Sequence, residues 1–141
     1  MKILADTNVL LRAVMADDEP QSKLAIETLE SAETVSVSVQ SLCEFAWVLD
    51  QRYSAARADI ASAIRRLIDT RNVVVNRPAA EAGLSMLDAG GDFADGVIAF
   101  EGDWLGAETF VSFDRKAVSL LSAQGRKTRL LRTERVSRGR R

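Results

Sequence analysis

Four carboxylates stand where short apolar segments meet predicted helices. Asp6 and Asp114 each directly follow a short apolar run. Glu44 lies one turn into an apolar helix, and Asp95 opens another. In a parallel α/β sheet the carboxyl ends of the strands share one edge, where ligands bind. We therefore expect the four side chains to converge there as ligands of a divalent metal ion.

Electrostatics favours a metal over four independent acids. Two unit charges about 4 Å apart repel by roughly 4 kcal/mol at an effective dielectric near 20. Several such pairs would raise the carboxylate pKa values or push the side chains apart. A bound divalent cation removes this cost, and helix N-termini reduce it.

Each acid also has a purely structural interpretation as a helix cap. The caps would be made by Asp6, by Glu44 with Ser41 in a capping box, by Asp95 with Asp92 in a similar arrangement, and by Asp114. Taken singly, a cap is the better explanation of each acid. The four together favour a metal site, and one side chain can fill both roles.

Polar residues beside the acids could support such a site. Thr7, Asn8 and Ser112 are small groups that could hold the carboxylates or the waters of a metal. Arg115 and Lys116 follow Asp114 and could face a phosphate, although a solvated first helical turn explains them equally well.

The absence of histidine from the chain limits its chemistry. Ser-His-Asp and Cys-His triads are excluded, and so is a histidine pair that cleaves RNA through the 2′-hydroxyl. The single cysteine, Cys43, cannot form an internal disulfide and is expected in the core. Oxygen ligands alone point to magnesium or manganese.

The charges of the 141 residues are unevenly distributed. Eight of the 19 Lys/Arg residues and one of the 20 acids fall in 126–141, which leaves 1–125 with 11 basic and 19 acidic residues, a net charge of −8. The basic end could contact RNA phosphates, solubilise the chain or meet an acidic partner. No apolar run is long enough to span a membrane and no signal peptide is evident, so we expect a cytoplasmic protein.

Hydrophobic periodicity predicts alternating strands and helices. Strands are expected at 2–5, 35–39, 72–75, 109–113 and 129–131, and helices at 7–15, 17–32, 41–51, 55–70, 78–89, 93–103 and 115–123. This alternation indicates a parallel sheet with helices on both faces. We expect one domain over 1–131 and a basic, mobile tail over 132–141. The aromatic residues expected in the core are Trp47, Trp104, Phe93, Phe100, Phe110 and Phe113.

Four sequence motifs resemble the acidic motifs of PIN-domain nucleases. They are Asp6-Thr7-Asn8-Val9-Leu10-Leu11-Arg12, Glu44 within Ser-Leu-Cys-Glu-Phe-Ala-Trp-Val-Leu, Asp92-Phe93-Ala94-Asp95-Gly96-Val97-Ile98-Ala99, and Ser112-Phe113-Asp114-Arg115-Lys116. Their order and context are most similar to VapC-type toxins of bacterial toxin–antitoxin pairs. One departure is Gly96, where alanine is expected, and it weakens the helix by up to about 1 kcal/mol.

The resemblance implies a three-layer α/β/α fold with strand order 3-2-1-4-5, and a magnesium- or manganese-dependent endoribonuclease. It also implies a homodimer and an antitoxin whose C-terminal segment covers the acidic groove. Asp6, Glu44, Asp95 and Asp114 become the catalytic and metal-binding residues, with Asp92 as an auxiliary. Asp6 and Asp95 would bind the main ion directly, while Glu44 and Asp114 would act through water or a second ion.

In the expected reaction, water rather than the ribose 2′-hydroxyl attacks the phosphate, which leaves a 5′-phosphate and a 3′-hydroxyl. Three alternatives remain. The chain could be a structure-specific DNA nuclease with the same metal chemistry, or a non-catalytic binding module whose acids only cap helices. A phosphoacceptor receiver domain ranks lower, because Asn76, not aspartate, follows the central strand.

Overall fold

The computed structural model describes residues 1–133, and the remainder of the predicted tail lies outside this range. Strands and helices alternate as predicted. The elements are β1 (Lys2–Leu4), α1 (Thr7–Val14), α2 (Glu19–Ser31), β2 (Thr34–Ser36), α3 (Val39–Gln51), α4 (Arg57–Ile68), β3 (Val73–Val74), α5 (Arg77–Asp88), α6 (Phe93–Trp104), β4 (Phe110–Ser112), α7 (Arg115–Ala123) and β5 (Thr128–Leu130). The α/β class is therefore confirmed.

The first three strands form one parallel sheet in the order β1-β2-β3. Ile3 pairs with Val35 and Val35 pairs with Val73, so these three side chains form a row that packs in the main core. On the opposite face, Leu4 is 73% exposed and Val74 is 54% exposed. The predicted helical layer does not cover that face at these two positions.

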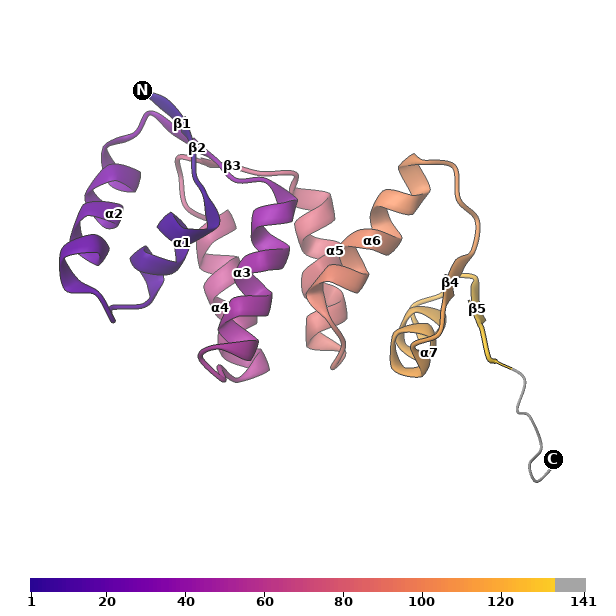
Figure 1. Ribbon diagram of the computed structural model, residues 1–141. Helices are drawn as coiled ribbons and strands as arrows, with labels where there is room; N and C mark the ends of the chain where they lie inside the picture. Colours follow the sequence, from indigo (N-terminus) through magenta and orange to yellow (C-terminus); the bar gives the residue numbers. More distant parts are fainter. Residues whose placement is uncertain (134–141) are drawn as a thin grey trace.

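The last two strands form a second parallel sheet, with Phe110 paired to Thr128 and Val111 paired to Arg129. In Figure 1 the segment from β4 to β5 lies beyond α6, well away from β1–β3. Both parts of the predicted order, 3-2-1 and 4-5, are present, but within residues 1–133 β1 and β4 are not hydrogen-bonded to each other. The continuous order 3-2-1-4-5 is thus not confirmed.

Helix α3 begins earlier than predicted. The Ser38 side chain accepts a hydrogen bond from the Ser41 backbone N–H at 3.1 Å, so Ser38 is the cap and β2 ends at Ser36. The predicted capping box of Ser41 with Glu44 is wrong, because a serine three residues earlier already fills the capping position. This leaves the Glu44 carboxylate available to other partners.

The main core lies beneath the first sheet, where Phe45, Ile64 and Phe93 are fully buried. Helices α5 and α6 approach closely above Gly83 and Gly96. A Cβ on Gly96 would lie 2.8 Å from the Met86 Cβ, and one on Gly83 would lie 2.6 Å from the Phe93 ring. Gly96 is therefore required by packing, which explains the departure from alanine.

A second, smaller core fixes α7 against α5 and α6. It consists of Met86, Ala99, Ala117 and Leu121. Arg126 adds to this attachment by donating to the Ala99 carbonyl and to Asp103. The segment carrying β4 and β5 is therefore attached to the α5–α6 pair rather than to the first sheet.

Several aromatic residues are not where the sequence predicted them. Trp47 is 58% exposed, Trp104 is 80% exposed and Phe113 is 67% exposed. Trp47 and Trp104 belong to helices whose other faces fill the core, and Phe113 follows the end of β4. Their apolar neighbours in the sequence therefore did not indicate their exposure. Phe93 is buried as predicted, whereas Phe110 is partly buried against the second core.

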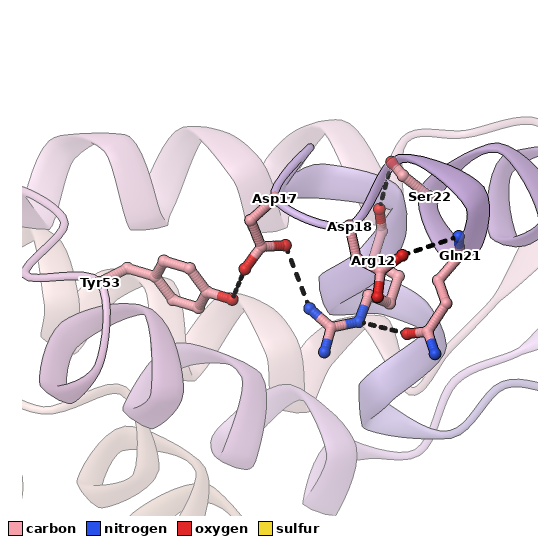
Figure 2. Close-up of polar contacts among 6 residues, drawn as sticks. All are labelled: Arg12, Asp17, Asp18, Gln21, Ser22 and Tyr53. Carbon is pink, nitrogen blue, oxygen red and sulfur yellow. Dashed lines mark hydrogen bonds and ion pairs between the residues drawn. The ribbon is translucent and has the colours of Figure 1, made fainter.

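A polar network ties the loop after α1 to the end of α3 (Figure 2). Tyr53 donates to Asp17 at 2.7 Å, Arg12 donates to Asp17 at 3.1 Å and to Gln21 at 2.7 Å, and Ser22 donates to the Arg12 carbonyl. The Tyr53 hydrogen bond lowers the pKa of Asp17 and raises that of Tyr53. The network fixes the N-terminal helices on the side away from the second sheet.

Candidate acidic site

The first pair of acids lies where β1 leads into α1. Asp6 occupies the position before α1 and is exposed, but its side chain caps no backbone N–H. The next residue, Thr7, is buried and donates a hydrogen bond of 2.6 Å to Glu44. Thr7 therefore holds the Glu44 carboxylate beside the start of α1. The neighbouring Asn8 is exposed.

The second group of acids surrounds the start of α6. Asp92 accepts from the Ala94 N–H at 3.4 Å and is the cap of α6, while the half-buried Asp95 lies in its first turn. Asp114 caps α7 by accepting from the Ala117 N–H at 3.0 Å. Ser112 accepts from the Asp114 N–H at 2.9 Å and so holds the turn that carries this acid.

These three acids share a negative potential. Burial raises the pKa of Asp95 above its ordinary value, and the charges of Asp92 and Asp114 raise it further. Cys43, which is partly buried against the main core as predicted, also lies in a negative potential. Burial and then the charges of Asp92 and Glu101 raise the pKa of Cys43 to about 11. At neutral pH Cys43 is therefore a thiol, not a nucleophile or a ligand.

A cleft of about 270 Å³ adjoins the second group. Asp92, Asp95 and Asp114 line it together with Trp47 and Lys116. Arg57 also lines the cleft, where it donates to the Gly91 carbonyl. A single-stranded nucleotide could place its base on the exposed indole and its phosphate near Lys116. Lys116 therefore lines the cleft, and Trp47 lines it as well, although the apolar sequence of its helix predicted a core position.

The predicted convergence of all four acids is not found. Asp6 and Glu44 do not line the cleft that holds Asp95 and Asp114. In the described part of the chain, no three acidic or thiol side chains are grouped so that they could hold a metal ion. Carboxylate oxygens suit magnesium or manganese. In the described residues, however, the four carboxylates are not placed so that they could bind one ion together. The reason is that Asp114 follows β4, and β4 is not beside β1.

Comparisons with known proteins identify the family. The family model of the PIN domain matches residues 3–120. The chain therefore belongs to the PIN-domain family, the family that its four acidic motifs resemble.

Among solved structures, the chain is similar to the crystal structure of Mycobacterium tuberculosis VapC20, described as a sarcin-ricin loop cleaving toxin. The two are 22% identical over 89% of this chain and 96% of that chain, with a TM-score of 0.41. No curated protein matches the chain. Among residues 1–133, no helix is long and apolar enough to cross a membrane.

Proposed function

We propose that this protein is an endoribonuclease of the VapC type, the toxin of a toxin–antitoxin pair, that depends on magnesium or manganese. Membership of the PIN-domain family and the order of the four acidic motifs support the proposal. Its partners would be an RNA substrate, a cognate antitoxin and a second copy of itself, in the cytoplasm.

The structural observation that carries this proposal is that Asp92, Asp95 and Asp114 line the same cleft. A carboxylate whose pKa is raised by burial and by two neighbouring acids is a favourable place for a cation. Lys116 and Arg57 line the same cleft, and their charges would offset that of a phosphodiester. An acidic cleft without a cation would repel RNA.

In the active form, Asp6, Glu44, Asp95 and Asp114 would together hold the ion, and the strand order would be the continuous 3-2-1-4-5. The ion would supply a polarised water and charge stabilisation at the phosphate. Thr7 would orient Glu44 in that site, and Ser112 would hold the turn of Asp114. The proposal therefore requires the two acid groups to meet.

The test uses the purified full chain with RNA and with a DNA oligonucleotide of the same sequence, in magnesium, manganese or EDTA. We expect cleavage of RNA only with metal, leaving 5′-phosphate and 3′-hydroxyl ends. Asp6→Asn should abolish cleavage, whereas Asp59→Asn, which changes an exposed acid of α4, should not. A 2′,3′-cyclic phosphate end, or equal activity of Asp6→Asn, would contradict the proposal. Cleavage of DNA alone would favour the DNA-nuclease alternative.

The observed caps favour one second candidate, a non-catalytic binding module. Asp92 and Asp114 both cap helices, so part of the acidic set has a structural role regardless of any metal. For such a module, growth inhibition on expression without a partner would be the same for wild type and Asp6→Asn. A loss of inhibition in Asp6→Asn would exclude it.

A further inference from the structure

One side of the cleft carries three side chains that the proposed metal chemistry does not use. Trp47 and Asp50 line it from α3, and Arg57 lines it from the first turn of α4. Trp47 and Asp50 are three residues apart, so they lie on the same face of their helix. All three side chains are exposed. The acids and Lys116 line the cleft from the starts of α6 and α7, so its two sides differ in chemistry (Figure 1).

Neither charged side chain of this group is in an ion pair within residues 1–133. The arginines that do pair with acids there are Arg12, Arg65, Arg77 and Arg126. Asp50 accepts from the Gln51 side chain at 2.7 Å, and its carboxylate has lone pairs for further donors. Arg57 donates through Nη1 to the Gly91 carbonyl, which holds the guanidinium at the wall of the cleft. Both groups therefore retain hydrogen-bonding capacity for a ligand.

The position of Arg57 in its helix is locally unfavourable. The first turn of a helix favours acids over cations, because its free N–H groups carry a partial positive charge. Arg57 nevertheless occupies the first position of α4, after Ala56, whose side chain makes no cap. Its bond to the Gly91 carbonyl uses one of five N–H donors. A residue that breaks a local preference in this way is typical of a functional site.

The three side chains together suit a nucleobase. The exposed indole of Trp47 offers a surface on which a base stacks. The carboxylate of Asp50 only accepts hydrogen bonds, whereas the guanidinium of Arg57 only donates them. A base that both groups recognise must present donors to one and acceptors to the other. The cleft of about 270 Å³ is near the lower limit of roughly 300 Å³ for small-molecule sites, so it suits a single nucleotide.

Guanine meets this requirement better than the other three bases of RNA. Its N1–H and its N2 amino group are adjacent donors that one carboxylate accepts together, and its O6 and N7 are adjacent acceptors for an arginine. Adenine and cytosine each present one amino donor beside a ring-nitrogen acceptor, which a carboxylate repels. Uracil presents a single N–H between two carbonyls. Single-stranded RNA leaves these edges free for recognition.

We propose that Trp47, Asp50 and Arg57 form a guanine-binding subsite that selects where the RNA is cut. Trp47 stacks on the base, Asp50 accepts from its N1–H and N2 amino group, and Arg57 donates to its O6. The phosphate beside this guanosine then lies toward Lys116, on the other side of the cleft. The choice of cut site rests on the proposed function, whereas the preference for guanosine in binding needs no cleavage.

Binding of short single-stranded RNAs tests the subsite without any activity measurement. The purified full chain is titrated, in calcium instead of magnesium, with fluorescein-labelled uridine hexamers that carry one central guanosine, inosine, adenosine or uridine. We expect the guanosine hexamer to bind at least about tenfold more tightly than the adenosine and uridine hexamers, as one bidentate contact would give. Inosine lacks the N2 amino group, so its hexamer should have an intermediate affinity. A gel run after each titration checks that the hexamers are intact.

The direction of the Asp50 effect separates recognition from simple charge repulsion. Asp50→Asn removes a negative charge, so an Asp50 that is only solvated predicts equal or tighter binding of every hexamer. The subsite predicts the opposite for guanosine alone, a loss of about tenfold. Retained binding of the uridine hexamer shows that the variant is folded. Asp59→Asn, which removes an exposed acid of α4 outside the cleft, is the matched control and should keep the guanosine preference.

A second pair of variants tests Arg57. Arg57→Lys keeps the positive charge but loses the planar fork of N–H donors. We therefore expect it to lose most of the guanosine preference, while the salt dependence of uridine-hexamer binding stays the same. Arg52→Lys changes an exposed arginine at the end of α3 that does not line the cleft, and it should behave as wild type.

Equal affinity of the wild type for the guanosine and adenosine hexamers would overturn the inference. So would a guanosine preference that Asp50→Asn retains, or a wild type that binds none of the hexamers. Mapping the cut ends of a long RNA in magnesium then separates the two proposals. If the wild type cuts RNA without preferring positions next to guanosine, the subsite is wrong and the proposed function stands. If it prefers guanosine in binding but cuts no RNA, the subsite stands and the proposed function is wrong.

Discussion

The part of the chain around β1–β3 and the part around β4–β5 differ in how they are stabilised. The first buries a large core that includes Phe45, Ile64 and Phe93. The second has four buried side chains, of which Met86 and Ala99 belong to α5 and α6. A small cluster of this kind cannot stand alone, so the C-terminal segment depends on whatever it contacts. The comparison shows why this segment, and not the first sheet, should be the more easily loosened part of the molecule.

The largest expected difference between the two parts is in stability. Phe45→Ala should lower the free energy of unfolding by about 3–5 kcal/mol, because it empties a fully buried position. Leu121→Ala should instead speed hydrogen exchange mainly in 110–130, with a smaller loss in denaturant unfolding. Urea titration and hydrogen-exchange mass spectrometry measure the two effects. Equal and uniform effects of both changes would mean that the parts form a single cooperative unit.

The contact between α5 and α6 is the next most sensitive feature, since it joins the two parts. Gly96→Ala should cost about 1–3 kcal/mol, because its Cβ would overlap Met86 and the backbone of α5. Gly102→Ala, on the same helix, would place its Cβ an ordinary 3.7 Å from Ala107. That control should stabilise the protein by about 0.5–1 kcal/mol through helix propensity. A tolerated Gly96→Ala would show that the helices can separate.

The two tryptophans offer a matched test of the cleft. Trp47→Ala should weaken binding of single-stranded RNA about tenfold, the effect expected from loss of one stacked base. Trp104→Ala changes a more exposed indole outside the cleft and should leave affinity unchanged. Fluorescence anisotropy in EDTA separates binding from cleavage. Equal losses in both variants would remove Trp47 from the RNA-binding surface.

The ion pair between Arg126 and Asp103 should contribute less. Arg126→Gln is expected to loosen the C-terminal segment by about 0.5–1 kcal/mol, and the effect should shrink as salt rises. Arg129→Gln, an exposed change on β5, is the control. Hydrogen exchange of β4 and β5 gives the readout. An effect that does not depend on salt would assign the stabilisation to the bond with the Ala99 carbonyl.

The smallest effect concerns Asp95, which lies in the second acid group with Asp92 and Asp114. Because the folded state raises the pKa of this carboxyl, its contribution to stability is present at low pH and is lost as pH rises through the folded pKa. Asp95→Asn should therefore raise the melting temperature slightly at pH 7, and the gain should disappear as the pH falls below the pKa of an unfolded aspartate. Melting curves from pH 3 to 8 measure this. A loss of stability at pH 7 would show that the carboxylate makes favourable contacts.

Local features were predictable because neighbouring residues decide them. The alternation of strands and helices, the cap by Asp114 and the location of Cys43 at the core all follow from short-range pattern and composition. The start of α3 was mispredicted because two serines compete for one cap. The exposure of Trp47 and Trp104 could not be predicted from neighbouring residues. An apolar helix sequence does not indicate how much of the helix surface other elements cover.

By itself, the sequence determined the element order, the family motifs and the absence of histidine chemistry. Only the tertiary structure showed which strands pair and why residue 96 is glycine. It also showed that Asp6 and Glu44 lie outside the cleft that Asp95 and Asp114 line. The physical reason is that the alternation of residues along a strand indicates which face is buried, but not which strand lies beside it. Pairing is selected by contacts between residues that are far apart in the chain.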